Sequence, residues 1–239
     1  LRLEEGDFCT VIGGNGAGKS TLLNSIAGVF PVDEGSISIN NIDVTKMPEY
    51  KRAKYIGRVF QDPMVGTAGN MQIEENLILA MRRGKNLGLK WAFKDSEQVF
   101  FKERLALLGL GLEDRLSARM GLLSGGQRQS ITLLMATMLR PDLLLLDEHT
   151  AALDPKTAEN VLQLTDKLVS EHNLTTLMIT HNMRDALRFG NRLIMMDAGR
   201  IIYDVKGEEK KKLTVADLLQ KFEVAGEGAL SDRMMLGSK

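Results

Sequence analysis

Four short apolar runs along the chain end abruptly in polar or glycine-rich sequence. They are FCTVI (8–12), YIGRVF (55–60), LLLLD (143–147) and TTLMIT (175–180). Short apolar runs with such boundaries are typical of buried strands in a parallel sheet. Ligands of these sheets bind beyond the carboxyl ends of the strands, so the four endings predict one shared site.

Apolar residues at helical spacing separate these runs. One pattern covers residues 22–26 and stops at Gly28, and another covers residues 158–169. The alternation of strands and helices predicts the α/β class with a mostly parallel sheet. Two hairpin-like stretches, 36–44 and 192–204, predict antiparallel edges.

The pattern changes after residue 62, because helical periodicity continues there without a strand signal. We therefore expect one domain with an inserted helical subdomain. The core would comprise residues 1–62 and 136–204, the helical subdomain residues 63–135, and the C-terminal tail residues 205–239. The tail is interpreted as a charged linker with one short helix, and residues 226–239 are expected to be mobile.

Composition narrows the class further. The 239 residues suffice for a substantial core, and the Lys plus Arg and Asp plus Glu totals are both 31. This balance gives no reason to expect nucleic acid or an acidic membrane surface as a partner. The single cysteine, Cys9, excludes an intrachain disulfide, and its place in a predicted strand indicates a buried apolar role. No apolar run approaches the ~18 residues of a membrane-spanning helix, so we expect that the chain does not enter a bilayer itself.

A glycine-rich loop follows the first predicted strand and precedes a predicted helix. Its sequence, GGNGAGKS (13–20), matches the whole pattern of a phosphate-binding P loop. Backbone N–H groups would surround the phosphates, Lys19 would reach the terminal phosphates and the Ser20 hydroxyl would hold Mg²⁺. The candidate nucleotide-binding residues here are Gly13, Gly14, Asn15, Gly16, Ala17, Gly18, Lys19, Ser20 and Thr21. The alternative is a merely flexible glycine turn.

Two carboxylates follow the third apolar run, in LLLLDE. Asp147 can hold Mg²⁺ through a water, and Glu148 can polarise an attacking water. Carboxylates after a strand often mark only its exit at the surface. The P loop upstream favours the interpretation as a nucleoside triphosphatase.

A second anion-binding pattern, SGGQ (124–127), precedes another predicted helix. The first N–H groups of a helix lack intrahelical partners, and the helix dipole favours an anion there. An N-cap serine followed by a glycine turn is the structural alternative. Residue spacing alone leaves both interpretations open.

Six elements in order resemble the nucleotide-binding subunit of ATP-binding cassette (ABC) transporters. They are the P loop, the strand-terminal Gln61, LSGGQ (123–127), LLLLDE, AALD (151–154) and His181. In that family two cassettes face each other head to tail, and the P loop of one copy and the LSGGQ of the other enclose one ATP. The resemblance implies a homodimer whose closure depends on ATP.

The resemblance also implies residue roles. Glu148 would be the general base, His181 would hold the γ-phosphate and orient the water, and Gln61 would contact Mg²⁺ and water as a sensor. Lys19 completes the catalytic group, and the metal candidates are Ser20, Gln61 and Asp147. The remaining nucleotide contacts would come from the partner copy through Ser124, Gly125, Gly126 and Gln127, with Asp154 as a further contact across the dimer.

The chain departs from the usual family pattern at two places. The family usually stacks an aromatic residue on adenine, but no Tyr or Trp precedes Gly13 here. His149 also stands where most members have proline, and we interpret it as a packing residue. The sequence around it, DEHTAALDPKTA, looks most like cassettes of bacterial import systems assigned to aromatic amino acids or related solutes.

The resemblance therefore implies an ATPase, binding ATP and Mg²⁺, that couples dimer closure to solute import. Its partners would be integral membrane permease subunits, received at residues 64–77, and indirectly an extracellular solute-binding protein. The chain would lie at the cytoplasmic face of the membrane.

The alternative is a soluble ABC ATPase acting on DNA or ribosomes, but the 63 positions from Gln61 to Ser124 are too few for the long coiled-coil arm of DNA-maintenance relatives. The translation-factor relatives carry two cassettes. We expect no nucleic acid partner, and a small-molecule kinase leaves LSGGQ, AALD and His181 unexplained.

Overall fold

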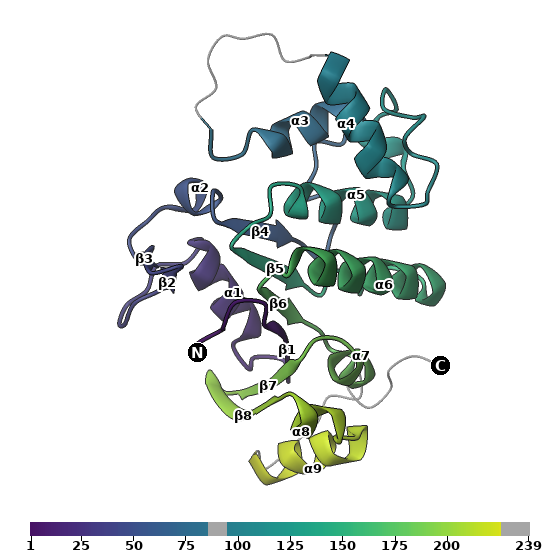
Figure 1. Cartoon of the computed structure of the whole chain (residues 1–239). Coiled ribbons are helices and arrows are strands. Elements are labelled where there is room, and N and C mark those ends of the chain that lie inside the picture. Colours follow the sequence, from purple (N-terminus) through teal and green to yellow (C-terminus); the bar gives the residue numbers. More distant parts are fainter. Residues whose placement is uncertain (86–94, 226–239) are drawn as a thin grey trace.

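A six-stranded sheet runs through the middle of the molecule (Figure 1). Its spatial order is β4 (Ile56–Val59), β5 (Leu143–Asp147), β6 (Thr176–Ile179), β1 (Phe8–Gly13), β7 (Arg192–Asp197) and β8 (Arg200–Lys206). The first five are parallel, and β8 pairs antiparallel with β7. The computed structural model describes residues 1–85 and 95–225, so the expected mobility of residues 226–239 lies outside the described part. The predicted α/β class, mostly parallel sheet and antiparallel edge are confirmed.

Helices cover both faces of this sheet because neighbouring strand residues point to opposite sides. On one face, α1 (Lys19–Ala27) packs Leu23 and Ala27 against Val11 and Leu145. On the other face, α5 (Gly125–Thr137) and α6 (Pro155–His172) pack against Leu144 and neighbouring strand residues. Cys9 lies on the α1 face, fully buried, and burial raises the pKa of its thiol to about 12, so the expected apolar role is confirmed.

The hairpin predicted at residues 36–44 forms, but it does not extend the main sheet. Its strands β2 (Ser38–Ile39) and β3 (Ile42–Asp43) make a separate two-stranded sheet. The prediction of an antiparallel edge was wrong here because Ile39 and Val44 pack into the apolar cluster under α1. The short helix α2 (Glu49–Arg52) lies on the same side, and the buried Arg52 side chain donates to the carbonyls of Ser25 and Ile26 in α1.

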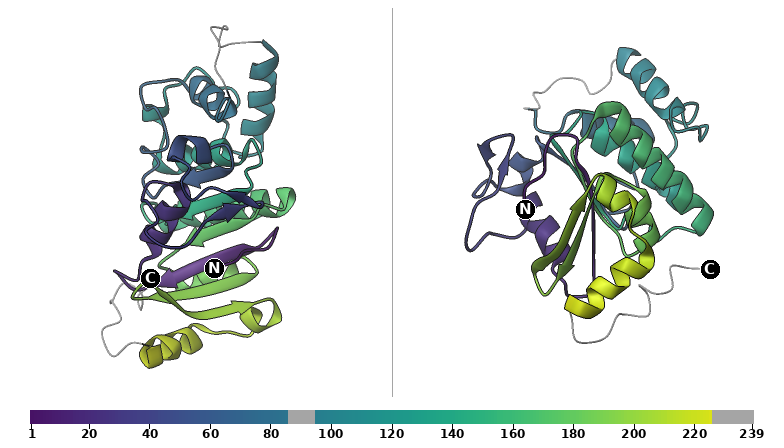
Figure 2. Two further views of the ribbon diagram at one scale, coloured as in Figure 1. Left: turned by 90° about the vertical axis from the view of Figure 1, so that its left-hand side faces the viewer. Right: turned by 60° about the horizontal axis from the view of Figure 1, so that its bottom comes forward.

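The predicted helices between β4 and β5 are also present. They are α3 (Ile73–Met81), α4 (Asp95–Ala106) and α5, and a short 3₁₀ helix that was not predicted, η1 (Met120–Leu122), precedes α5. Ile73, Leu77, Phe101 and Leu105 share a buried apolar cluster with Ile131 of α5. Figure 2 shows that α3 and α4 lie at one end of the molecule, beyond the sheet.

The charged stretch after Val205 is not a linker, which corrects the prediction from its sequence. Strand β8 continues to Lys206, and α8 (Glu208–Lys211) follows. Lys210 is only 2% exposed, because its ammonium donates to the carbonyls of Phe189 and Gly190 just after α7 (Met183–Arg188). The last described helix, α9 (Val215–Ala225), packs on α7 and β7. A helix C-terminus leaves carbonyls unpaired, so it can accept from a lysine that looks solvent-facing in the sequence.

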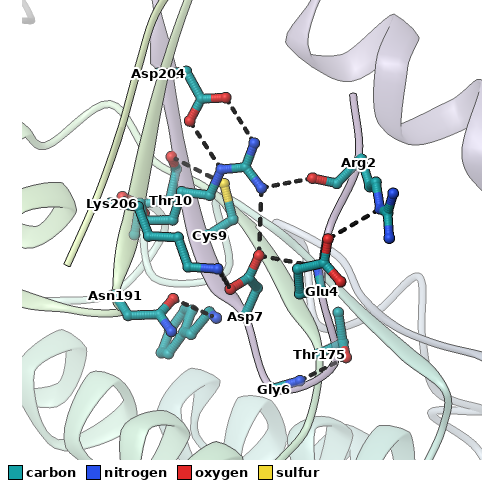
Figure 3. A network of polar contacts seen from close by, with 12 residues as sticks. Arg2, Glu4, Gly6, Asp7, Cys9, Thr10, Thr175, Asn191, Asp204 and Lys206 are labelled. Carbon is teal, nitrogen blue, oxygen red and sulfur yellow. Dashed lines mark hydrogen bonds and ion pairs between the residues drawn. The ribbon is translucent and has the colours of Figure 1, made fainter.

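A polar network ties the N-terminal segment to the β7–β8 hairpin (Figure 3). The carboxylate of Asp7, 2% exposed, lies 2.7 Å from Lys206 Nζ and 3.3 Å from Arg192, which also forms a bidentate pair with Asp204. Burial would raise the pKa of Asp7, but the bonds from Lys206 and Arg192 hold it below its ordinary value. Arg192 also donates to the carbonyl of Arg2, so the network fixes the chain before β1.

Over residues 1–85 and 95–225, no helix has the length and apolar character needed to cross a bilayer.

Candidate functional site

The glycine loop connects β1 to α1 at the carboxyl edge of the sheet. Gly18 forms the N-cap of α1 with φ 93°, a left-handed conformation that a side chain makes costly. The turn of the β7–β8 hairpin contacts the loop, since Gly199 N donates to the carbonyl of Ala17 at 3.1 Å. Asn15, Gly16, Ser20 and Thr21 are exposed, so this part of the predicted site is open to a ligand.

Lys19 folds back over the loop that precedes it. Its Nζ donates to the carbonyl of Gly13 at 2.9 Å and to that of Gly14 at 3.1 Å, and the side chain is buried. Burial lowers the pKa of Lys19, while the nearby carboxylates of Glu148 and Asp147 act in the opposite direction. The ammonium thus lies inside the loop, near Asp147 at the end of β5 and Glu148 just after it.

Asp147 faces an arginine that sequence reasoning missed. Arg58, on β4, lies 3.7 Å from the Asp147 carboxylate, donates to Asn24 of α1 at 2.7 Å and stacks on the Phe60 ring with 4.6 Å between guanidinium and ring centre. Burial raises the pKa of Asp147 and Glu148 raises it further, whereas Arg58 opposes both effects. The sequence did contain a signal for this pair, because Arg58 is a charged residue inside the otherwise apolar run YIGRVF (55–60).

Glu148 points away from Asp147, toward the end of the next strand. Its backbone has φ 47°, a left-handed conformation that is uncommon for a residue with a side chain and that turns the chain at this point. The Glu148 Oε1 and His181 Nε2 atoms lie 2.5 Å apart, and their side chains are 14% and 35% exposed. The structure therefore brings together two side chains that lie 33 positions apart in sequence, in reach of a common ligand.

The segment that carries Gln61 is linked to α5, called here the signature helix because it begins in the LSGGQ signature (123–127). Gln61 is exposed at the end of β4, and the carbonyl of the preceding Phe60 accepts from Gln129 Nε2 at 3.1 Å. Arg128, next to Gln129 on α5, donates to the carbonyls of Met120, Gly121 and Leu123 at 3.1 Å each. Arg128 thus positions the loop before Ser124, whereas Gln129 joins α5 to the segment that carries Gln61. Neither buried side chain stood out in the sequence.

The segment 124–127 begins α5 with a capping box. Ser124 Oγ accepts from Gln127 N, and Gln127 Oε1 accepts from Ser124 N, both at 3.2 Å. The structural alternative considered for Ser124 is therefore present, and it leaves the N–H groups of Gly125 and Gly126 without intrahelical partners. Ser124 and Gly125 are exposed, and in the described parts of the chain no hydrogen bond joins residues 124–127 to the P loop.

Asp154 and His149 both stabilise α6 from outside the helix: Asp154 caps its first turn and His149 packs against it. Asp154 is the N-cap of α6, and its carboxylate accepts from Thr157 N at 3.1 Å. The exposed Asp154 has a lowered pKa, first because of its hydrogen bonds with Thr157. His149 is buried with Nε2 3.0 Å from Thr165 Oγ1, and burial lowers its pKa to about 4. His149 is thus a packing residue, as expected.

Comparison with known proteins decides the family. A family model described as "ABC transporter" matches residues 1–151, more than half of the chain. The chain belongs to the ABC transporter family. A tyrosine transport ATP-binding protein of Clostridioides difficile (strain R20291) is 48% identical over 94% of this chain and 89% of its own length. A phosphonates import ATP-binding protein of Synechococcus sp. is 35% identical over 85% of this chain and 76% of its own length.

Solved structures agree with the fold of this cassette. A dimeric structure of a post-hydrolysis state of an ATP-binding cassette, bound to ADP and Pi, matches with a TM-score of 0.72 and 30% identity. The match covers 86% of this chain and 88% of that chain. The predicted P-loop core is confirmed, and the ABC cassette described here is an ATP-hydrolysing protein.

The donor set of the cassette fits Mg²⁺. Hydroxyl, amide and carboxylate oxygens are the ligands this ion prefers, and Ser20, Gln61 and Asp147 offer one of each. Among residues 1–85 and 95–225, no group of three or more His, Cys, Asp or Glu side chains could hold a metal.

Proposed function

We propose that this cassette is the ATPase subunit of a solute importer and that two copies complete each ATP site. The observation that carries the proposal is the division of the candidate residues within one chain. Lys19, Asp147, Glu148 and His181 lie together, whereas within the described parts of the chain the exposed start of α5 at Ser124 forms no hydrogen bond or ion pair with any of them. A self-complementary dimer would bring the Ser124 of one copy to the P loop of the other. The dimeric arrangement of the related cassette bound to ADP and Pi supports this.

The proposed chemistry divides among the side chains of both copies. Lys19 and the loop N–H groups bind the phosphates, and Mg²⁺ held by Ser20 and Asp147 would supply charge neutralisation for the transferring phosphoryl group. Glu148 accepts a proton from the attacking water, and His181, 2.5 Å from it, fixes the orientation of the carboxylate and contacts the γ-phosphate. The helix start of the second copy contributes further N–H groups toward the γ-phosphate.

The membrane partners follow from the same proposal. In the segment 64–77 the apolar side chains of Met64 and Val65 are 45% and 64% exposed. These side chains could form part of the surface that binds a loop of the permease. The helical subdomain of residues 63–135 would move with this loop, and its separate apolar cluster supports that subdivision. The cassette would lie at the cytoplasmic face of the membrane and would meet the solute-binding protein only through the permease. The tyrosine transport relative supports an aromatic amino acid as the solute.

The variant Glu148→Gln tests this proposal. Without the carboxylate as proton acceptor, ATP turnover should fall by about 10²- to 10⁴-fold, while ATP binding remains. We expect the variant to sediment as a dimer in ATP and as a monomer in ADP. The control Glu148→Gln/Ser124→Glu, which places a negative charge against the γ-phosphate, should stay monomeric in ATP. Normal turnover by Glu148→Gln, or no ATP-dependent association, would contradict the proposal.

A further inference from the structure

The second glycine of the signature helix lies against the first turn of α6. A Cβ atom placed on Gly126 would lie only 2.1 Å from Thr157 Cγ2, far inside van der Waals contact. The next atoms of Thr157, Cβ and Oγ1, would lie at 3.5 and 3.8 Å, which are ordinary distances. A single methyl group therefore excludes a side chain at position 126.

The neighbouring glycine makes a milder contact with the same element. A Cβ on Gly125 would meet Leu153 Cδ2 at 3.4 Å. Gly125 is exposed whereas Gly126 is buried, so the two glycines have different surroundings. Leu153 and Thr157 flank Asp154, the N-cap of α6, on either side. The start of α5 and the AALD segment thus form one packed unit within the same copy.

We propose that Thr157 is a positioning residue, which sets the signature glycines against the AALD segment so that both elements meet the partner copy as one rigid surface. This inference rests on the proposed function, because it concerns the surface that would close on the second nucleotide. The glycine at position 126 is then required by packing inside the chain, and not by the size of the phosphate that its N–H group faces.

The reason Thr157 can do this is its stiffness. A β-branched side chain in a helix has few χ1 rotamers, and the Thr157 side chain also bonds to the Asp154 carboxylate, so its methyl group stays turned toward Gly126. The backbone N–H of Thr157 is also fixed, since it donates to Asp154 at 3.1 Å. An alanine at position 126 would push α5 away from α6 and displace Ser124 and Gly125 relative to Asp154.

The test uses four variants of the full chain: Gly126→Ala, Thr157→Ser, Gly126→Ala/Thr157→Ser and Gly126→Ala/Thr157→Val. Serine keeps the hydroxyl and loses the methyl group, whereas valine keeps a methyl group in its place, so the two double variants are matched. Three readouts are measured: the unfolding temperature without nucleotide, the affinity for a fluorescent ATP analogue, and steady-state ATP turnover.

We expect Gly126→Ala to lower the unfolding temperature by roughly 5 °C through overpacking. Turnover should fall by about 100-fold, because a displacement of about 1 Å of a phosphate-contacting group has that effect. Affinity for the ATP analogue should stay unchanged, since the P loop of the same copy is untouched. Thr157→Ser in the double variant should restore most of the unfolding temperature and recover about tenfold or more of the turnover, whereas Thr157→Val should restore neither.

An outcome in which Gly126→Ala/Thr157→Ser stays as inactive and as unstable as Gly126→Ala would overturn the inference. A fall in turnover for Gly126→Ala with an unchanged unfolding temperature would also overturn it, because phosphate contact would then be the reason for the glycine. The unfolding temperatures are measured without nucleotide, so they test the packing even if wild-type protein neither hydrolyses ATP nor associates. Wild-type protein that neither hydrolyses ATP nor associates would contradict the proposed function, and not this inference.

Discussion

Glu148 and Asp147 are adjacent in sequence but belong to different surroundings. The left-handed backbone at Glu148, with φ 47°, sends its carboxylate toward His181, while Asp147 faces Arg58 and α1. Two carboxylates that both point into one low-dielectric site would repel each other, and separate partners reduce that cost. In the proposed mechanism this separation would let Asp147 serve the metal while Glu148 serves the water.

Removal of the Arg58 charge should change the pH dependence of turnover. Burial already raises the pKa of Asp147, and Arg58 opposes that rise, so Arg58→Met should raise the pKa further. A carboxylate with a raised pKa becomes protonated at higher pH, and we expect the acid limb of the ATP turnover profile to move toward neutral pH. Activity near about pH 6 should fall more than activity near about pH 8.

The matched control is Arg58→Lys, which keeps a positive charge near Asp147. Its acid limb should stay close to that of the wild-type protein. Equal acid limbs for Arg58→Met and wild type would show that Arg58 does not influence the ionisation of Asp147.

At the level of elements, local sequence patterns predicted the strands and the glycine loop, but they did not predict contacts between segments far apart in sequence. The strands β1, β4, β5 and β6 and the loop between β1 and α1 follow from short apolar runs and from glycine spacing. The carboxyl-edge position of Glu148 and His181 follows from strand parallelism. The pairs Arg58–Asp147 and Gly126–Thr157 could not be predicted, because each joins segments far apart in sequence whose approach depends on packing.

The tail shows why charge runs mislead. KGEEKKKL has the composition of a solvated linker, yet Lys210 alone among its lysines is buried at the carbonyls that follow α7. Lys210→Met should leave the carbonyls of Phe189 and Gly190 unpaired and lower the free energy of unfolding by about 1–3 kcal/mol. Urea denaturation followed by circular dichroism measures this.

Lys211→Met is the control one residue away. Lys211 is exposed and its ammonium pairs with Glu208 in its own helix, so its loss should change stability by less than about 0.5 kcal/mol. Equal losses for the two variants would contradict the anchoring role of Lys210.

At the scale of the whole molecule, the proposed function requires one chain to carry two different halves of an ATP site. The P loop with Asp147, Glu148 and His181 would form one half, and the start of α5 with the AALD segment would form the other. Helix α5 also packs on both the sheet and the helical cluster, and Gln129 bonds to the carbonyl of Phe60 beside Gln61. Movement at the segment after Gln61 would therefore reach the signature helix of the same copy.

Complementation between two inactive variants tests the shared site most directly. Lys19→Ala removes the P-loop lysine and Ser124→Glu blocks the signature end, so each variant alone should lack ATP turnover. In an equal mixture about half of the dimers contain one copy of each, and one of the two sites in such a dimer is intact. We expect the mixture to recover about a quarter of wild-type turnover. Absence of any recovery, with both variants folded and with ATP-analogue affinity retained by Ser124→Glu, would contradict a site built from two copies.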